Sequence, residues 1–173
     1  HNHNDVGSVT LYRDGRPLLI DVGVETYSKK TFSPQRYEIW TMQSGWHNLP
    51  QFDPDGAKYD QQPGAEFAAA DVTVTDALDG LAMDLAPAYG AVPGLGRYRR
   101  SVHLTEAGLT LHDETDYPGT VALTLMSVEK PAVNGDTVAF GALAAATVTG
   151  ADKIVTEAVP ITDPRLRQAW PDT

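Results

Sequence analysis

Residues 97–116 contain two runs, RYRRSVHL at 97–104 and LTLHDETD at 109–116, separated by Glu106-Ala107-Gly108. Both runs are short, lack a helical period and are bounded by turn residues, so they predict two β-strands. The short turn between them predicts an antiparallel hairpin. His103 and His112 then lie on adjacent strands, where we expect both to be structural residues.

Similar short runs continue along the chain and are separated by turn residues such as Tyr117-Pro118-Gly119 and Asn134-Gly135-Asp136. Many short strands without helical periodicity are typical of an antiparallel sandwich. We therefore predict one all-β domain over residues 1–173, an antiparallel multi-stranded β-sandwich. A short helix is expected at Asp163–Trp170, with Asp163 as N-cap. The other predicted strands are Glu66–Thr75, Gly80–Leu85, Thr120–Val128, Thr137–Phe140, Ala144–Val148 and Lys153–Val159.

The charge balance restricts the class of partner. Thirteen basic and 23 acidic residues give a net charge of −10, which argues against nucleic acid or an anionic membrane surface as the main partner. The deficit lies downstream of residue 40, so the first 40 residues are neutral and could meet a polyanionic sugar. With no cysteine in the chain, disulfides and thiolate metal sites are excluded. Arg97, Arg99 and Arg100 are expected on an exposed strand face.

Three potential metal ligands lie in the first 48 residues: His3, Asp21 and His47. Two imidazoles and one carboxylate are a common donor set for zinc. Asp14-Gly15 predicts a tight hairpin that joins Gly7–Tyr12 to Pro17–Val22. A regular hairpin would keep His3 about 16 Å from Asp21, so a shared metal site requires an irregular backbone at Asn4–Gly7.

The region that leads to His47 is predicted to be extended. Residues 24–35 lack periodicity and are expected to form a long surface loop. Arg36–Gln43 alternates, with Tyr37, Ile39 and Thr41 on one side, and predicts a strand. Ser44–Pro50 is expected to continue as a second extended piece.

These motifs resemble the heparinase II/III-like polysaccharide lyases. The resemblance rests on His1-Asn-His-Asn-Asp-Val-Gly-Ser8, on Leu11–Gly23, on Arg36-Tyr37 and on His47-Asn48. Proteins of that family join a helical toroid to a large antiparallel β domain, which begins near this motif. The resemblance is strong over residues 1–50 and is only a pattern of short strands from Gly64 to Trp170.

The resemblance implies specific roles for several residues. His3, Asp21 and His47 match the family's zinc ligands, and the zinc is expected to be structural. His1 falls on an active-site histidine and Tyr37 on a catalytic tyrosine of related alginate lyases, while Arg36 is a candidate for binding a substrate carboxylate.

The resemblance also implies an activity for a longer parent protein. We expect the chain to be the C-terminal β domain of a lyase that cleaves an acidic, uronic-acid-containing polysaccharide, with the toroid domain absent here. Two alternatives stay open, a non-catalytic carbohydrate-binding or interdomain module and a zinc hydrolase.

Overall fold

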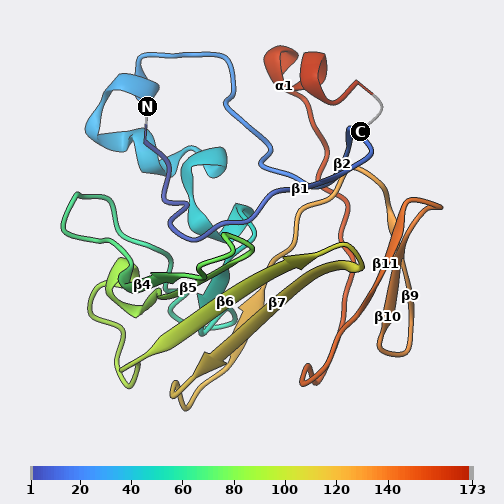
Figure 1. Ribbon diagram of the computed structural model, residues 1–173. Helices are drawn as coiled ribbons and strands as arrows, with labels where there is room; N and C mark the ends of the chain where they lie inside the picture. The colour runs from blue at the N-terminus through green and yellow to red at the C-terminus, as the bar shows by residue number, and fades with distance from the viewer. Residues whose placement is uncertain (1, 172–173) are drawn as a thin grey trace.

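The computed structural model describes residues 2–171, and within them the chain forms short strands in antiparallel sheets with almost no α-helix (Figure 1). The predicted all-β, sandwich-like fold is therefore confirmed. One sheet contains four strands in the order β4-β5-β6-β7, another contains three in the order β11-β10-β9, and the pairs β1-β2 and β3-β8 complete the set. The strands are β1 Leu11–Arg13, β2 Arg16–Leu19, β3 Pro50–Phe52, β4 Ala70–Val74, β5 Gly80–Asp84, β6 Tyr98–Thr105, β7 Gly108–Thr115, β8 Val121–Leu123, β9 Pro131–Asn134, β10 Thr137–Phe140 and β11 Ala144–Thr147.

The hairpin of β6 and β7 is the longest paired segment, and it confirms the prediction for residues 97–116. Its register is regular from Tyr98↔Thr115 to Thr105↔Gly108. Because side chains alternate along a strand, Tyr98 and Arg100 point to one face and Arg99 and Ser101 to the other. Tyr98 is buried, so the first of these faces is the core side.

Arg100 lies on that core side, and the prediction that it is exposed was wrong. Its side chain is fully buried, and it pairs across the sheet with Asp113, which is 14% exposed. The guanidinium donates from Nε to Oδ1 (2.9 Å) and from Nη2 to Oδ2 (2.8 Å) of Asp113, a bidentate arrangement. Burial disfavours the charged arginine, but the hydrogen bonds and charge of Asp113 outweigh it and raise the pKa of Arg100.

Apolar side chains gather in three clusters, which together form the core. The largest lies between the four-stranded sheet and β3, where the Phe52 ring makes edge-to-face contacts with Tyr89, Tyr98 and Tyr117. A second cluster packs Leu18 of β2 against β10 and β11, and a third packs Ile20 and Val22 against α1 (Pro164–Ala169). The segment from Leu18 to Val22 is thus packed against both the three-stranded sheet and α1.

The C-terminal third differs from the predictions in two places. Pro131–Asn134 forms β9, which was not predicted, and Lys153–Val159 forms no strand, so that prediction was wrong. The helix is confirmed: Asp163 accepts hydrogen bonds from the N–H groups of Arg165 and Leu166. No helix in residues 2–171 has the length and apolarity to cross a membrane.

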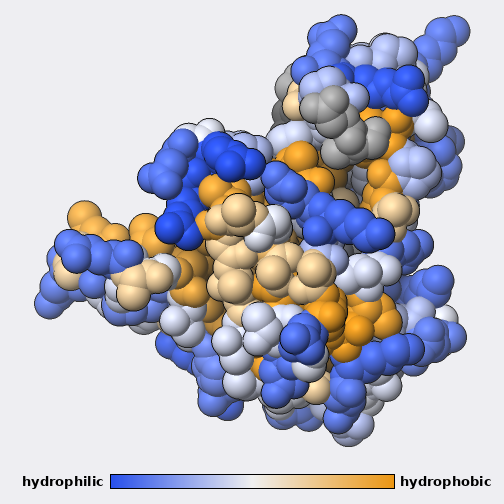
Figure 2. Space-filling model, turned by 90° about the vertical axis from the view of Figure 1, so that its right-hand side faces the viewer, coloured by the Kyte–Doolittle hydropathy of each residue, from blue (hydrophilic) through white to orange (hydrophobic). Residues whose placement is uncertain are grey.

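In the three-stranded sheet, Val138 and Phe140 of the central strand β10 share one face and are buried. Residues 145–147 of the edge strand β11 are exposed. On the side of the molecule seen in Figure 2, apolar side chains form a patch between hydrophilic borders.

The N-terminal hairpin is shorter than predicted and has the predicted turn. Asp14 and Gly15 both have positive φ (51° and 75°), as a tight two-residue turn requires. The register then shifts between Leu11 and Tyr12, so regular pairing ends there. Upstream, the Ser8 N–H donates to the Asp5 carbonyl (3.0 Å), and Gly7 has φ +79°. This turn is the irregular backbone predicted at Asn4–Gly7.

Residues 30–46 form a series of 3₁₀ turns, so the predicted strand at Arg36–Gln43 was wrong. The turns are η1 (Lys30–Phe32), η2 (Pro34–Glu38), η3 (Trp40–Met42) and η4 (Ser44–Trp46), and η4 also replaces the start of the extended piece predicted from Ser44. Pro34 begins η2, whose cap Ser33 accepts a hydrogen bond from the Gln35 N–H. Local bonds such as Met42 N–H to the Ile39 carbonyl (2.9 Å) satisfy the backbone without a partner strand.

We predict that Asp113→Ala lowers the free energy of unfolding by about 3–5 kcal/mol, because it leaves the Arg100 charge buried without its partner. The control is Glu114→Ala, on the neighbouring exposed position of β7; its effect should stay within about 0.5 kcal/mol. Urea unfolding measures both. Equal midpoints for the two variants would contradict the assigned role of the pair.

Candidate metal centre

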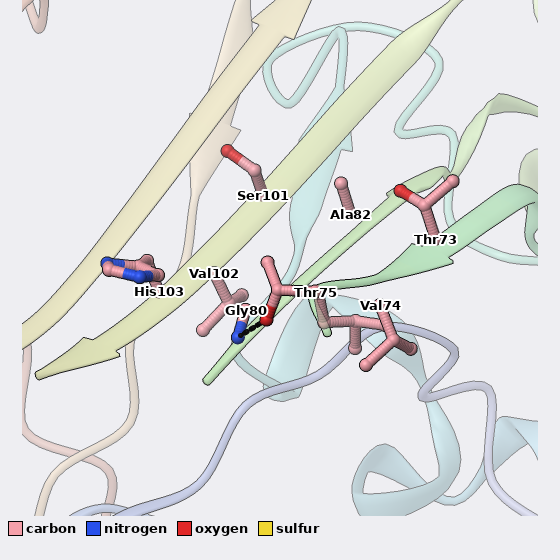
Figure 3. A pocket seen from close by; sticks show the side chains of 9 residues that line it. Thr73, Val74, Thr75, Gly80, Ala82, Ser101, Val102 and His103 are labelled. Carbon is pink, nitrogen blue, oxygen red and sulfur yellow. Dashed lines mark hydrogen bonds between the residues drawn. The ribbon is translucent and has the colours of Figure 1, made fainter. Parts of the chain in front are cut away.

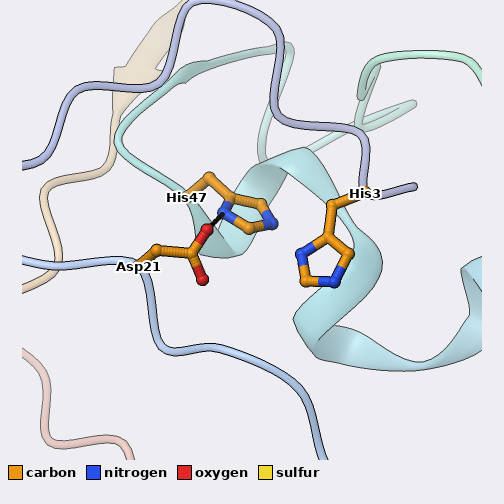
Figure 4. Close-up of side chains that lie close together, drawn as sticks. All are labelled: His3, Asp21 and His47. Carbon is orange, nitrogen blue, oxygen red and sulfur yellow. Dashed lines mark ion pairs between the residues drawn. The ribbon is translucent and has the colours of Figure 1, made fainter. Parts of the chain in front are cut away.

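Three segments without regular secondary structure bring His3, Asp21 and His47 together. His3 precedes the turn at Asp5–Ser8, Asp21 follows β2, and His47 follows η4. One donor atom from each residue lies within 4.8 Å of the others. Figure 4 shows His47 between the other two, with one ring nitrogen toward Asp21 and the other toward His3. The structure therefore brings together the three residues that the sequence analysis selected as candidate metal ligands.

The donor geometry fits a shared metal ion. His47 Nδ1 lies 3.4 Å from Asp21 Oδ2, and donors about 2.1 Å from a tetrahedral zinc ion lie about 3.4 Å apart. The contact lacks hydrogen-bond geometry, and both ring nitrogens of the buried His47 are without a hydrogen-bond partner. Such groups are costly to bury. One donor atom from each of the three residues lies within 4.8 Å of the others, so these separations would have to shorten for all three to bind one zinc ion.

The electrostatics also suit a cation. Burial lowers the pKa of His3, although the nearby Asp21 carboxylate opposes this effect. The His47 imidazole and the hydrogen bond from the Gly23 N–H lower the pKa of Asp21, against the opposing effect of burial. Neutral imidazole and ionised carboxylate are the forms that bind metals.

The two carboxylate oxygens of Asp21 have different surroundings. Oδ1 accepts a hydrogen bond from the Gly23 N–H (2.7 Å), while Oδ2 is the atom nearest His47. The short Asp-Val-Gly turn thus fixes the carboxylate orientation. Gly23 has φ +92°, which favours glycine at this position.

The other predicted site residues are placed as follows. Tyr37 is half-buried in η2, and its carbonyl accepts a hydrogen bond from Gln43 Nε2 (3.0 Å). Arg36 donates from Nε to the Asn2 carbonyl (2.8 Å) and from Nη1 to the Thr31 carbonyl (3.0 Å). Arg36 therefore joins η1 and η2 to the N-terminal segment. His1, predicted to be catalytic, lies outside the described residues.

Two hollows on the described part of the chain could accept a small ligand. One, of about 340 Å³, is lined by Asn2, His3 and Asn4 together with residues of the 61–67 loop. The other, of about 290 Å³, lies on the outer face of the four-stranded sheet (Figure 3), where Thr75 Oγ1 accepts from the Gly80 N–H. At its edge, His103 is paired with Asp79 (3.4 Å). Only the first hollow adjoins the metal-ligand cluster.

The sequence analysis missed two residues that hold the cluster in place, Asn48 and Arg100. Asn48 belongs to the His-Asn dipeptide noted above, but that motif gave no indication of its hydrogen bonds. Arg100 was placed on the surface because of its charge. Its pairing with Asp113 could have been found from the alternation of side chains and the hairpin register.

Comparison with models of known protein families gives no match, and comparison with curated proteins gives no significant match either.

We predict that the chain binds one zinc ion through His3, Asp21 and His47. His47→Ala should abolish binding because it removes the central donor, whereas the exposed His103→Ala should bind as wild type does. Equilibrium dialysis against zinc followed by atomic absorption measures the stoichiometry. A wild-type chain that retains no zinc, or equal retention by both variants, would refute the assignment.

Proposed function

We propose that the chain is the β domain of a heparinase II/III-like polysaccharide lyase, which cleaves a uronic-acid-containing polysaccharide by β-elimination. The observation that carries this proposal is the cluster of His3, Asp21 and His47 within 4.8 Å. These residues come from separate motifs of the resemblance, and no sequence proximity requires them to meet. The all-β fold is compatible with the same family.

The proposed zinc is structural. His47 is buried to 1% exposure, and His3, Asp21 and His47 belong to segments that are not paired with one another as strands. When bound, zinc would cross-link these segments through its ligands. The N-terminal segment and the 3₁₀ turns would then keep a fixed relation to each other.

The reaction needs a base, an acid and a group that neutralises the substrate carboxylate. The base removes the C5 proton, the C4–O bond breaks as a C4–C5 double bond forms, and the acid protonates the departing glycosidic oxygen. We assign Tyr37 as base or acid. His1 and Arg36 would assist at the carboxylate or the leaving oxygen, and a toroid domain would supply the remaining groups.

Arg36 supports the placement of Tyr37 in this assignment. Its guanidinium reaches from η2 to the Asn2 carbonyl (2.8 Å), so the residue next to Tyr37 contacts the residue next to His1. The segment of Tyr37 is thus in direct contact with Asn2. This hydrogen bond occupies the Nε–H donor of Arg36. A substrate carboxylate would therefore have to compete with the Asn2 carbonyl for that donor.

Zinc should stabilise the folded chain by mass action. At a free zinc concentration of a hundred times Kd, the gain is about 2.7 kcal/mol, which corresponds to a rise in Tm of roughly 5–10 °C for a chain of this size. His47→Ala should lose this rise, while His103→Ala should keep it. Thermal melts with zinc and with chelator measure the difference. An unchanged wild-type Tm would contradict a structural role for the metal.

The 173-residue chain alone should show no sustained elimination, because we propose that the substrate binds in a cleft between the β domain and a toroid domain. Proximity and orientation contribute on the order of 7–11 kcal/mol to such reactions. Joined to a toroid, the β domain should release unsaturated uronate from alginate, heparan sulfate or hyaluronan. Tyr37→Phe should then lower the rate by roughly 10²–10⁴-fold, while Tyr12→Phe, on the exposed β1, should not change it.

Absorbance of the unsaturated uronate distinguishes the alternatives in that assay. A zinc hydrolase would release sugar without this absorbance, and a non-catalytic module would bind polysaccharide without releasing product. Either result, or sustained elimination by the chain alone, would overturn the proposal.

A further inference from the structure

The three candidate ligands lie in backbone that no sheet holds in place. Asp21 follows the end of β2, His47 follows the last 3₁₀ turn, and His3 precedes a turn. Donor atoms on such segments would be poorly fixed unless something else restrains the backbone. A fixed geometry therefore requires contacts from outside the cluster.

Asn48 provides such contacts to two of the three segments. It is fully buried and directly follows His47. Its side-chain Nδ2 donates to the Ile20 carbonyl (3.1 Å), immediately before Asp21, and to the Val9 carbonyl (2.7 Å). Its Oδ1 accepts from the Met126 N–H (2.6 Å). One amide thus ties the segment of His47 to the segment of Asp21, with both N–H donors and the carbonyl oxygen hydrogen-bonded.

The segment of His3 is held from the same place. The Asn48 N–H donates to Ser8 Oγ (3.3 Å), and its carbonyl accepts from Arg100 Nη1 (2.7 Å). The same Nη1 also donates to the Gly7 carbonyl (2.9 Å). Gly7 and Ser8 belong to the turn that follows His3. The Asn48–Arg100 pair therefore contacts the backbone next to Asp21 and His47 and the turn that begins two residues after His3, and none of its hydrogen bonds goes to a ligand side chain.

We propose that Asn48 and Arg100 are positioning residues of the metal centre, which set its affinity and coordination geometry through the backbone of the three ligand segments. This inference rests on the proposed metal site. A buried polar network in which every member is satisfied holds one arrangement of its backbone partners. Loss of one member frees the ligand segments relative to each other, so each donor must be ordered again when metal binds.

The first test uses Asn48→Ala, with Co²⁺ as the metal probe. Titration of the chelator-treated chain should show an affinity at least roughly tenfold weaker than wild type, the scale seen when groups that orient metal ligands are removed. The visible bands of bound Co²⁺ should also change, because they report coordination geometry. A variant with reduced stability alone would not change either quantity while it remains folded.

Val138→Ala is the matched control, because it removes buried apolar volume from β10 in a cluster that contains none of the ligands. It should lower Tm and leave cobalt affinity and spectrum unchanged. Each titration is performed at a temperature well below the Tm of the metal-free variant.

Ser8→Ala is a milder second variant, and it decides the question if Asn48→Ala does not fold. It removes only the acceptor of the Asn48 N–H, so a loss of roughly 2–10-fold is expected, the range for one hydrogen bond. Wild-type affinity and spectrum in folded Asn48→Ala, or in Ser8→Ala where it is decisive, would overturn the inference. A wild-type chain that binds neither cobalt nor zinc would instead remove the metal site itself.

Discussion

The buried ion pair between Arg100 and Asp113 is the constraint on which the arrangement of the N-terminal segments depends. Removing a guanidinium from water costs several kcal/mol unless its donors and charge are satisfied. Asp113 compensates the charge with two hydrogen bonds. The remaining nitrogen, Nη1, lies among backbone and bonds the carbonyls of Gly7 and Asn48. A buried donor left unpaired is costly. The Arg100 side chain, which extends from β6, therefore also restrains the segments of Gly7 and Asn48, neither of which is part of a strand.

The candidate metal centre differs from that pair in how its polar atoms are satisfied. Around Arg100 each polar atom of the network has a partner, whereas both ring nitrogens of His47 are buried without one. Such unpaired buried nitrogens are a local cost. Zinc, when bound, would offset part of this cost through one of the two nitrogens, since imidazole nitrogen and carboxylate oxygen are donors that it takes. If the free energy of zinc binding contributes to folding, the folded chain is expected to be less stable when zinc is removed.

Much of the fold could be predicted from the sequence, because strands β4 to β7 carry local signals at their own positions. The stretch from Arg36 to Gln43 was misassigned for a physical reason. Alternation has a period of two and a 3₁₀ helix a period of three, so residues six apart share a face in both. Trp40 and Trp46 pack edge to face at 5.3 Å, a contact that the folded-back 3₁₀ turns allow, whereas six residues of regular strand would separate the two residues by about 20 Å. Ser33-Pro34 lay in the predicted surface loop of residues 24–35, and in the structure it begins η2, which continues into the misassigned stretch.

The candidate site was predictable in composition and not in geometry. His3, Asp21 and His47 could be named from their chemistry and from the resemblance, and the turn at Gly7 followed from the distance that a regular hairpin would impose. The N-terminal segment is joined to the sheet by a hydrogen bond between residues 93 apart, Arg100 and Gly7, for which no local pattern exists. Yet part of this contact was within reach. The short β6–β7 turn places Arg100 opposite Asp113, and alternation places both on the face of Tyr98. Two opposite charges on the core face of a hairpin indicate a buried ion pair. The N–H donors of a buried arginine that its carboxylate partner does not use need other acceptors, and backbone carbonyls of nearby loops can provide them.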